Sequence, residues 1–462
     1  MTVRTLDDAV EALLGFSGVR AAGHSALAAM AQAMPLLGDP HERLRVVHVT
    51  GTSGKTSTAY FVRALLEEAG FTTGLTVSPH IEAINERVQI GGVPLAADRF
   101  CAYVNAVLDR LAPLRGHLTY FELVVSLALT VFAREQVEYA VVEVGIGGTR
   151  DATNVCRRAD KLAVITPVGL DHTEKLGSTI AAIAAHKAGI IVPGGWAVVA
   201  EQSEEAVDVI RARADEIGAG VEVVPPHVIP AKAGTPGRSP EDSEGVLGTD
   251  PTPGHGVPAC AGMTVGGVPA CAGMTVRLPT YQLSNWALAY AAVRHLADRD
   301  GFAMPSPAAL DRTLTVTPPA RFEWFTGPDG RILLDGAHNP QKVAALVDSL
   351  RAAGLPPVPA LVTLSTAPPD KVTATLAALA PAVSHLVIPE FTLGHDAKVK
   401  VSVPAAQVAA AARAAGIPVR VIPDLRAAWA ELLADSAPDV LVTGSLYLAA
   451  LVRPWLIHWS TR

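Results

Sequence analysis

Arg45–Ser57, RVVHVTGTSGKTS, is the stretch that decides the fold. Its apolar first half predicts a buried strand, and the residues from Lys55 onward predict a helix that stops at Gly70. Glycines in the turn between them let backbone N–H groups approach phosphate oxygens, and the start of the helix favours negative charge. We therefore predict a nucleotide-binding loop made of Gly51, Thr52, Ser53, Gly54, Lys55, Thr56 and Ser57.

The spacing of this loop, G-x-x-G-K-T, is two residues shorter than that of the general phosphate loop. Lys55 supplies a positive charge to the phosphates, and the hydroxyl groups of Thr56 and Ser57 are candidate ligands for Mg²⁺. A bare Gly-Lys-Thr pattern also arises by chance. The flanking strand and helix favour nucleotide binding over that explanation.

Polar side chains also follow two other apolar runs. Glu143 lies at the end of the run Tyr139–Val144, and Asp171 and His172 follow the run Leu162–Thr166. The carboxyl ends of parallel strands border the crevice where open α/β sheets bind ligands. Glu143 and His172 are therefore candidate metal ligands, although a strand-end charge or a lone histidine is often structural.

The composition favours a large α/β protein. The chain has 462 residues, of which 50% are apolar and 18% charged, which suits helices packed on buried sheets. The net charge is −7 without a long basic run, which argues against a nucleic-acid groove. The four cysteines form no C-x-x-C pair, so a metal cluster or disulfide framework is not expected. No apolar stretch reaches the roughly 18 residues of a membrane span, and the N-terminus does not resemble a signal peptide. We expect a cytoplasmic protein that binds neither membranes nor nucleic acid.

Strand and helix patterns alternate in two blocks, which predicts two α/β domains. In the second block, strands are predicted at Ile332–Asp335, Ala360–Leu364, His385–Ile388, Val419–Ile422 and Val440–Thr443. We place an ATP-binding domain at 1–300, a linker at 301–318 and a smaller domain at 319–462.

The segment 225–280 interrupts the first block. It is rich in Gly, Pro and Thr, and contains the repeat GVPACAGMTV at Gly256–Val265 and again at Gly267–Val276. Two copies are too few for a solenoid. We interpret the segment as a flexible insertion, with an interaction element as the alternative.

Ten ordered motifs resemble the Mur ligase superfamily and, within it, the folylpolyglutamate synthase branch. They are HVTGTSGKTS (48–57), SPH (78–80) with ER (86–87), T-x-F-E (119–122), EVGIGGTRDATN (143–154), LDH (170–172), KAGI (187–190), Q-x-x-N (282–285), R-F-E (321–323), DGAHNP (335–340) and TGSLYL (443–448). The resemblance covers nearly the whole chain apart from the insertion. Peptidoglycan ligases generally lack the SPH and ER segment.

The resemblance implies a P-loop ATPase domain of the Mur ligase type with a mostly parallel sheet, followed by a smaller Rossmann-like α/β domain. It implies ATP and two Mg²⁺ ions as cofactors. Ser57 and Glu143 are expected to bind one Mg²⁺, and His172 and a carbamylated Lys187 the second. A carbamate suits this place because it is a carboxylate-like ligand, whereas an ammonium repels Mg²⁺. Lys55, His172 and Lys187 are the residues expected to carry the catalysis.

The resemblance also assigns the remaining residues of the site. ATP is expected to contact Gln282, Asn285, Arg321, Asp335 and His338. Folate or dihydropteroate is expected to contact Ser78, Pro79, His80, Arg87, Phe121, Glu122, Asp151, Thr153 and Asn154. Closure of the two domains would assemble the site and exclude water. Family members are often monomers, which we also expect here.

The implied reaction is an amide ligation. A substrate carboxylate attacks the γ-phosphate of ATP to give an acyl phosphate, and the amine of L-glutamate then displaces phosphate. Departures from the family pattern include His186 for Glu, Tyr281 for His and Ala320 for Gly. A ligase for peptidoglycan precursors, or a nucleotide-binding regulatory module without ligase activity, remain the alternatives.

Overall fold

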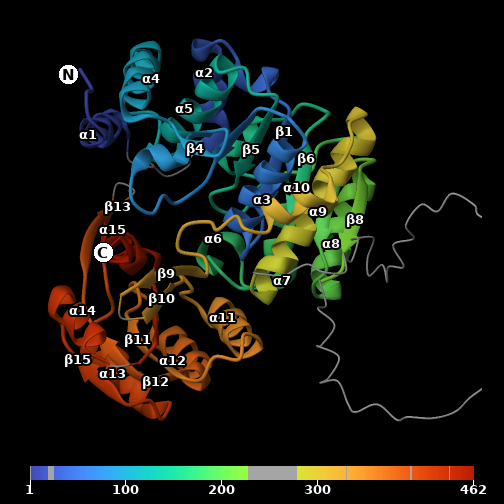
Figure 1. The fold of residues 1–462 in the computed structure, drawn as a ribbon. Coiled ribbons are helices and arrows are strands. Elements are labelled where there is room, and N and C mark those ends of the chain that lie inside the picture. The colour runs from blue at the N-terminus through green and yellow to red at the C-terminus, as the bar shows by residue number, and fades with distance from the viewer. Residues whose placement is uncertain are drawn as a thin grey trace, which may run out of the picture.

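The structure, a computed structural model, describes residues 2–18, 25–226, 278–328, 330–395, 398–435 and 437–461. The predicted insertion, with both copies of its repeat, falls almost entirely outside these residues. The described chain forms two α/β domains, one above the other in Figure 1. No described helix is long and apolar enough to span a bilayer.

The first domain is built on an eight-stranded sheet in the order β4-β3-β2-β5-β1-β6-β7-β8. Its strands are β1 (Val46–Thr50), β2 (Thr73–Thr76), β3 (Gln89–Ile90), β4 (Val93–Pro94), β5 (Tyr139–Glu143), β6 (Leu162–Ile165), β7 (Trp196–Ala200) and β8 (Gly220–Val224). Strand β3 pairs antiparallel with both β2 and β4, and the other pairings among the described strands of this sheet are parallel. Every residue of β1, β5 and β6 is buried, as their continuous apolar runs predict.

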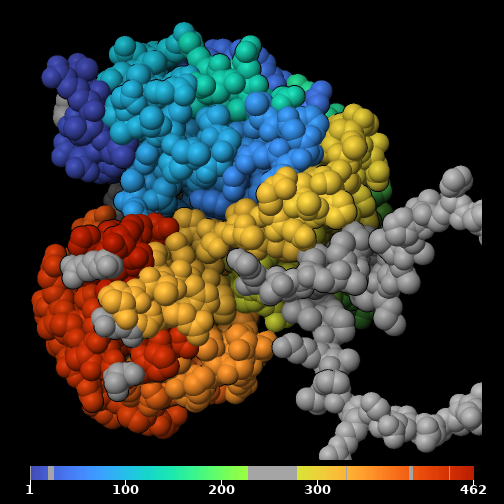
Figure 2. All heavy atoms as spheres, viewed as in Figure 1, coloured from blue at the N-terminus to red at the C-terminus, as the bar shows by residue number. Residues whose placement is uncertain are grey.

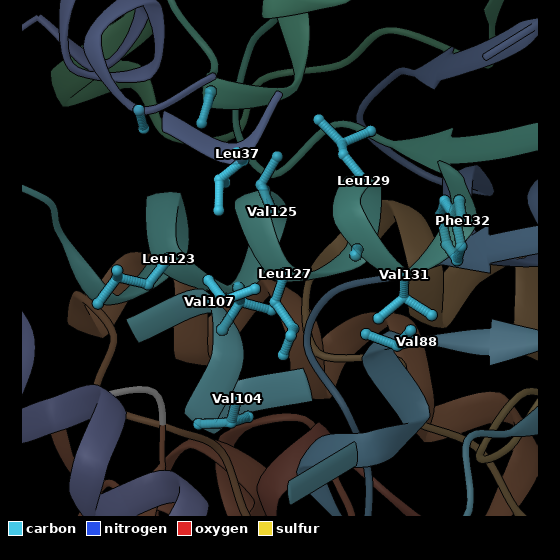
Figure 3. Close-up of a cluster of buried hydrophobic side chains, with 14 of the residues drawn as sticks. Leu37, Val88, Val104, Val107, Leu123, Val125, Leu127, Leu129, Val131 and Phe132 are labelled. Carbon is cyan, nitrogen blue, oxygen red and sulfur yellow. The ribbon is translucent and has the colours of Figure 1, made fainter. Parts of the chain in front are cut away.

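Helices cover both faces of this sheet, because successive strand residues point to opposite sides. One face carries α3 (Lys55–Glu68), α9 (Thr280–Asp300) and α10 (Pro307–Thr313). The other carries α1 (Leu6–Phe16), α2 (Ala26–Leu37), α4 (Ala97–Arg110), α5 (Tyr120–Arg134), α6 (Thr173–Leu176), α7 (Ile180–Ala188) and α8 (Glu204–Glu216). Helix α5 is buried nearly all round, and Figure 3 shows its Leu127 and Val131 among Val107, Val104 and Val88.

Helix α10 lies inside the stretch 301–318 that was predicted as a linker. Leu310 and Leu314 belong to the same core cluster as α3 and α9, so this stretch packs as part of the first domain. The chain crosses into the second domain only after it.

The second domain is a six-stranded sheet in the order β15-β12-β11-β16-β10-β9. Its strands are β9 (Glu323–Gly327), β10 (Gly330–Leu334), β11 (Val358–Val362), β12 (Val383–Ile388), β15 (Val419–Val421) and β16 (Asp439–Thr443). All pair in parallel except β9 with β10. A separate hairpin is formed by β13 (Thr392–His395) and β14 (Lys398–Val401). This sheet and the larger one confirm the predicted fold class.

Helices again lie on both faces of the smaller sheet. One face carries α11 (Pro340–Ala352), α12 (Pro369–Leu379) and α13 (Ala405–Ala414), and the other carries α14 (Leu425–Leu433) and α15 (Leu446–Ser460). Short 3₁₀ turns occur at Pro40–Arg43, Ile84–Arg87, Ala112–Leu114, Ala152–Val155 and Ala380–Ala382.

The two domains touch along a broad front, which Figure 2 shows as blue and yellow atoms against orange and red ones. Ile81, from the loop after β2, is part of the core cluster of the second domain. Arg453 of α15 forms ion pairs with Glu323 of its own domain and with Glu82 of the first. The carboxyl ends of β1, β5 and β6 therefore lie near the junction between the domains.

Candidate active site

The turn between β1 and α3 is held against the segment that follows β6. Gly51 and Gly54 have φ angles of 148° and 90°, which favour glycine. A Cβ atom on Gly51 would lie 1.8 Å from the Thr166 hydroxyl. That hydroxyl donates to the Ser53 carbonyl at 2.7 Å, and the Thr52 amide donates to a backbone carbonyl after β6 at 2.9 Å. These contacts fix the shape of the loop, and the first N–H groups of α3 have no partners within the helix.

Two lysine side chains meet at this turn. The Lys55 Nζ donates to the Gly51 carbonyl at 3.0 Å, and the Lys187 Nζ donates to the same oxygen at 2.7 Å. Lys187, near the end of α7, is only 3% exposed. Burial, with the Lys55 charge beside it, lowers the pKa of the Lys187 ammonium to about 7. A substantial neutral fraction of this amine is therefore present near neutral pH.

Glu143, the last residue of β5, faces the same turn. Its carboxylate accepts hydrogen bonds from the Thr56 hydroxyl at 3.0 and 3.1 Å and from the Ser78 amide at 3.1 Å. Burial raises the pKa of the Glu143 carboxyl even though Lys55 lies nearby. The hydroxyl beside this carboxylate is that of Thr56, whereas Ser57 is 2% exposed within the packed part of α3. The geometry thus favours Thr56 over Ser57 as the hydroxyl that completes a metal site.

Asp171 and His172 occupy the edge of the crevice. His172 adopts a left-handed conformation before α6, and its side chain is 46% exposed. Burial lowers the pKa of the His172 imidazole, so the ring is neutral near pH 7 and able to bind a metal. Burial opposes ionisation of Asp171, but His172, Lys342 and Lys371 outweigh it and lower the pKa of this carboxyl.

Among the described residues, no three His, Cys, Asp or Glu side chains come together as a metal site. Glu143 and the Thr56 hydroxyl nevertheless form an oxygen-rich pair of the kind that suits Mg²⁺, which usually keeps waters and phosphate oxygens among its ligands. The donor chemistry therefore fits a hard divalent cation that is only partly held by protein.

The Gly-rich turn after β5 is fixed from within by three predicted substrate ligands. Asp151 accepts hydrogen bonds from the Ile146 amide and from the Thr153 amide, each at 3.0 Å. Asn154 donates to the Gly189 carbonyl at 3.1 Å. All three side chains are buried, at 7%, 1% and 1% exposure. In this structure Asp151, Thr153 and Asn154 shape the turn rather than line an open surface.

The SPH and ER segments form one ordered loop. The Glu86 carboxylate accepts three backbone amides, from residues 81 to 83, at 2.7, 2.7 and 2.8 Å. Buried Arg87 donates to the His80 Nδ1 at 2.9 Å. Pro79 follows Ser78 through a cis peptide bond, and Ser78 and His80 are partly exposed toward the crevice. The loop is thus positioned mainly by Glu86.

Phe121 and Glu122 lie at the start of α5. Glu122 is fully buried, and its carboxylate accepts the Thr119 amide at 2.9 Å while Thr119 caps the helix in return. A Cβ atom on Gly145 would lie 2.6 Å from the Phe121 ring. Phe121 therefore borders the Gly-rich turn, while Glu122 serves the helix cap.

The second domain contributes Asp335, at the end of β10. Its carboxylate accepts the Tyr281 hydroxyl at 2.7 Å and the amides of Phe322 and Ala337 at 2.8 Å each. Burial raises the pKa of the Asp335 carboxyl, and these donors, with Arg321 nearby, oppose the shift. Tyr281 belongs to α9 of the first domain, so this hydrogen bond joins the two domains across the crevice.

Gln282 and Asn285 connect α9 to the phosphate loop. The Asn285 amide donates to Gln282 Oε1 at 3.0 Å, and the Gln282 amide lies 3.5 Å from the Arg321 carbonyl. A Cβ atom on Gly54 would lie 2.3 Å from Asn285 Oδ1. The helix thus places both amide side chains between the phosphate loop and Arg321, where the resemblance predicts ATP contacts.

Lys342, which the sequence did not single out, also enters the crevice. Its Nζ lies 3.1 Å from His338 Nε2, and the other ring nitrogen of His338 lies 2.7 Å from the Gly336 carbonyl. Burial and the Lys342 charge lower the pKa of His338 to about 3, so the ring is neutral. Lys371, also from the second domain, lies 3.7 Å from the Asp171 carboxylate. A lone lysine in a helix usually indicates a solvated charge, so no sequence pattern marked Lys342 as a site residue.

Comparison with known proteins gives a consistent assignment for both domains. Residues 49–219 match the Mur ligase middle domain, and residues 320–446 match the Mur ligase glutamate ligase domain. The chain is 32% identical over 440 residues to folylpolyglutamate synthase of Lacticaseibacillus casei, an alignment that covers 91% of this chain and 92% of that protein. It is 41% identical over 194 residues to dihydrofolate synthase/folylpolyglutamate synthase of Bacillus subtilis, covering 41% of this chain and 45% of that protein.

Solved structures agree. The bifunctional folylpolyglutamate synthase/dihydrofolate synthase of Yersinia pestis, complexed with AMPPNP and a Mn ion, superposes with a TM-score of 0.77 at 25% sequence identity. The superposition covers 99% of each chain.

Proposed function

Because the chain belongs to the folylpolyglutamate synthase family of ATP-dependent Mur-type ligases, we propose that it adds L-glutamate to the carboxylate of a folate or of dihydropteroate. The observation that carries this proposal is the meeting of Lys55, Lys187 and the Thr56–Glu143 pair at one turn. A second domain with its own glutamate-ligase match covers that turn.

The phosphates of ATP would lie on the first N–H groups of α3, with Lys55 neutralising their charge. A substrate carboxylate oxygen forms a bond to the γ-phosphorus, and the bond from that phosphorus to the bridging oxygen of ADP breaks. The glutamate amine then attacks the acyl carbon and phosphate leaves. Arg321 and Asp335 approach from the second domain, so closure keeps water from the acyl phosphate.

Glu143 and the Thr56 hydroxyl would hold a Mg²⁺ ion, which neutralises phosphate charge when bound. We propose a second metal position near His172 and Lys187. The neutral Lys187 amine, present because its pKa is about 7, can add to CO₂ and release a proton, giving a carbamate. That group replaces a repelling cation with an oxygen ligand.

The loop carrying Ser78, His80 and Arg87 supports a folate substrate, since Glu86 and the Arg87–His80 pair hold it rigidly beside Glu143. We further propose that the enzyme is a monomer and works in the cytoplasm. The face of ATP toward the second domain would be contacted by Gln282, Asn285 and His338.

The direct test is Lys55→Ala in an assay of ADP release. Wild-type protein should sustain ADP release over many turnovers only when ATP, a folate or dihydropteroate, and L-glutamate are all present. The variant should lose that release, because the phosphate charge is no longer neutralised. Retained substrate-dependent turnover in the variant would remove the basis of the assignment.

A substrate panel separates the remaining candidates. Turnover of dihydropteroate or tetrahydrofolate, but not of UDP-sugar peptides, would exclude a peptidoglycan ligase. ATP hydrolysis that needs no carboxylate substrate would instead favour a regulatory nucleotide-binding module. Deleting Pro230–Val276 should leave ligation unchanged; a loss would favour an interaction or binding role for that segment.

A further inference from the structure

Lys342 lies in the first turn of α11, directly after the DGAHNP motif, and its position is fixed by two contacts. Its backbone amide donates to the capping side chain of Asn339 at 2.9 Å. Its Nζ lies 3.1 Å from His338 Nε2. Because the Nδ1 of that ring faces the Gly336 carbonyl at 2.7 Å and must carry the proton, Nε2 accepts and Lys342 donates.

The surroundings of this ammonium are strongly cationic. Burial lowers the pKa of Lys342 to about 7, and the charge of Lys55 across the crevice adds to the effect, while Asp171 opposes it. Asp171 is already shared with Lys371 and His172. Lys342 is nevertheless partly exposed. Removing a lysine from water beside other cations is unfavourable unless an anion joins them.

We propose that Lys342 binds the terminal phosphoryl group of ATP from the second domain and holds it during transfer to the substrate carboxylate. This proposal rests on the proposed ligase function. Lys342 donates hydrogen bonds to phosphoryl oxygens, while the phosphorus bond to ADP breaks and the new bond to the carboxylate forms. Lys342 gives up no proton in this step. Lys55 and Lys342 thus bind the same phosphates from opposite domains.

The position of Lys342 favours the phosphate over the carboxylates of glutamate. Thr52 of the phosphate loop donates its hydroxyl hydrogen to the Gly169 carbonyl at 3.0 Å. Gln341 precedes Lys342 in the chain, and its side-chain amide contacts Gly169. Gly169 lies two residues before Asp171, so this turn of α11 packs against the loop that follows β6. A ligand that reaches Lys55 and Lys342 together must therefore lie at the phosphate loop.

The test compares the dissociation constants of AMPPNP and ADP, each with Mg²⁺, measured by calorimetry on the full-length chain. Lys342→Met should weaken AMPPNP binding about ten- to a hundredfold, the value of a charge-assisted hydrogen bond, and change ADP binding less than twofold. Lys342→Arg should regain most of the AMPPNP affinity. Arg351→Met, an exposed charge on the same helix, is the matched control and should behave like wild type.

Three results would overturn the proposal: equal weakening of both nucleotides, no weakening of either, or an effect confined to the KM for glutamate. Methionine relieves the burial of a charge, so Lys342→Met should unfold at or above the wild-type temperature, and Lys342→Gln repeats the comparison if it does not. Failure of wild-type protein to bind either nucleotide would refute the ligase function itself, and is distinct from all three.

Discussion

Tyr281 occupies a position where the family pattern has histidine, and the replacement preserves a hydrogen-bond donor to Asp335. Its hydroxyl donates to Asp335 at 2.7 Å, from the first domain to the second. Its ring also meets that of Phe322 edge-on, with centroids 6.2 Å apart. Tyr281→Phe removes the donor and leaves the ring contact, so it isolates the hydrogen bond between the domains.

A hydrogen bond to a charged acceptor contributes about 1.5–3 kcal/mol. Taking ~2 kcal/mol, and a tenfold change for each 1.36 kcal/mol, Tyr281→Phe should lower kcat/KM for ATP by roughly 30-fold. Burial already raises the pKa of the Asp335 carboxyl, and losing a donor raises it further. The acid limb of the pH–rate profile should therefore move to higher pH, because Asp335 becomes protonated sooner as pH falls.

Steady-state ADP release at varied ATP concentration measures both effects. Tyr281→His is the matched variant, since an imidazole N–H can donate to the same carboxylate and should recover most of the activity. A Tyr281→Phe enzyme within twofold of wild type would refute the reasoning. So would equal losses in the Phe and His variants, because the effect would then come from packing.

Three further outcomes follow from buried lysines. Activation by bicarbonate should increase as pH rises through about 7, where the Lys187 amine becomes neutral, and a carbamate resonance should appear in ¹³C NMR; absence of both would contradict the carbamate. Lys161 is 2% exposed, and burial lowers its pKa to about 7. Protonation therefore favours the unfolded state increasingly as pH falls from 10.5 toward 7, and Lys161→Met should raise the free energy of unfolding by about 4 kcal/mol at pH 7 but little near pH 10, measured by urea denaturation. A phosphate beside Lys342 should raise its lowered pKa, so AMPPNP binding at pH 7 should take up protons, detectable by calorimetry in buffers of different ionisation enthalpy. Proton release on AMPPNP binding would contradict a phosphate beside Lys342.

The sequence predicted the buried strands well, because a strand covered on both faces must be apolar throughout. The run Tyr139–Val144 corresponds to β5 at Tyr139–Glu143, and Ala360–Leu364 overlaps β11 at Val358–Val362. The two-residue strands β3 and β4 carry no such pattern and were missed. Helix α10 was taken as a linker, since proline-rich flanks hid the two leucines that it buries.

How well a site residue could be predicted depends on how local its sequence signal is. The phosphate loop and Glu143 follow from strand ends, which any parallel sheet brings to one edge. The pairing of Glu143 with Thr56 rather than Ser57 depends on which face of the first turn of α3 points toward β5, and spacing does not specify that. Asp151 and Asn154 share a motif with Glu143, and their hydrogen bonds hold the Gly-rich turn together and tie it to Gly189.

Both domains contribute positive charge to the crevice, so closure of the two domains depends on the bound nucleotide. Lys55 and Lys187 come from the first domain, and Lys342 from the second. Burial lowers the pKa values of both Lys187 and Lys342, and the charge of Lys55 lowers them further, so these groups oppose the approach of the domains while Lys187 carries no carbamate. Direct contacts, such as the one from Tyr281 to Asp335, only partly offset that repulsion. A triphosphate supplies the missing negative charge, whereas a diphosphate supplies less, so closure should depend on the group that the reaction transfers.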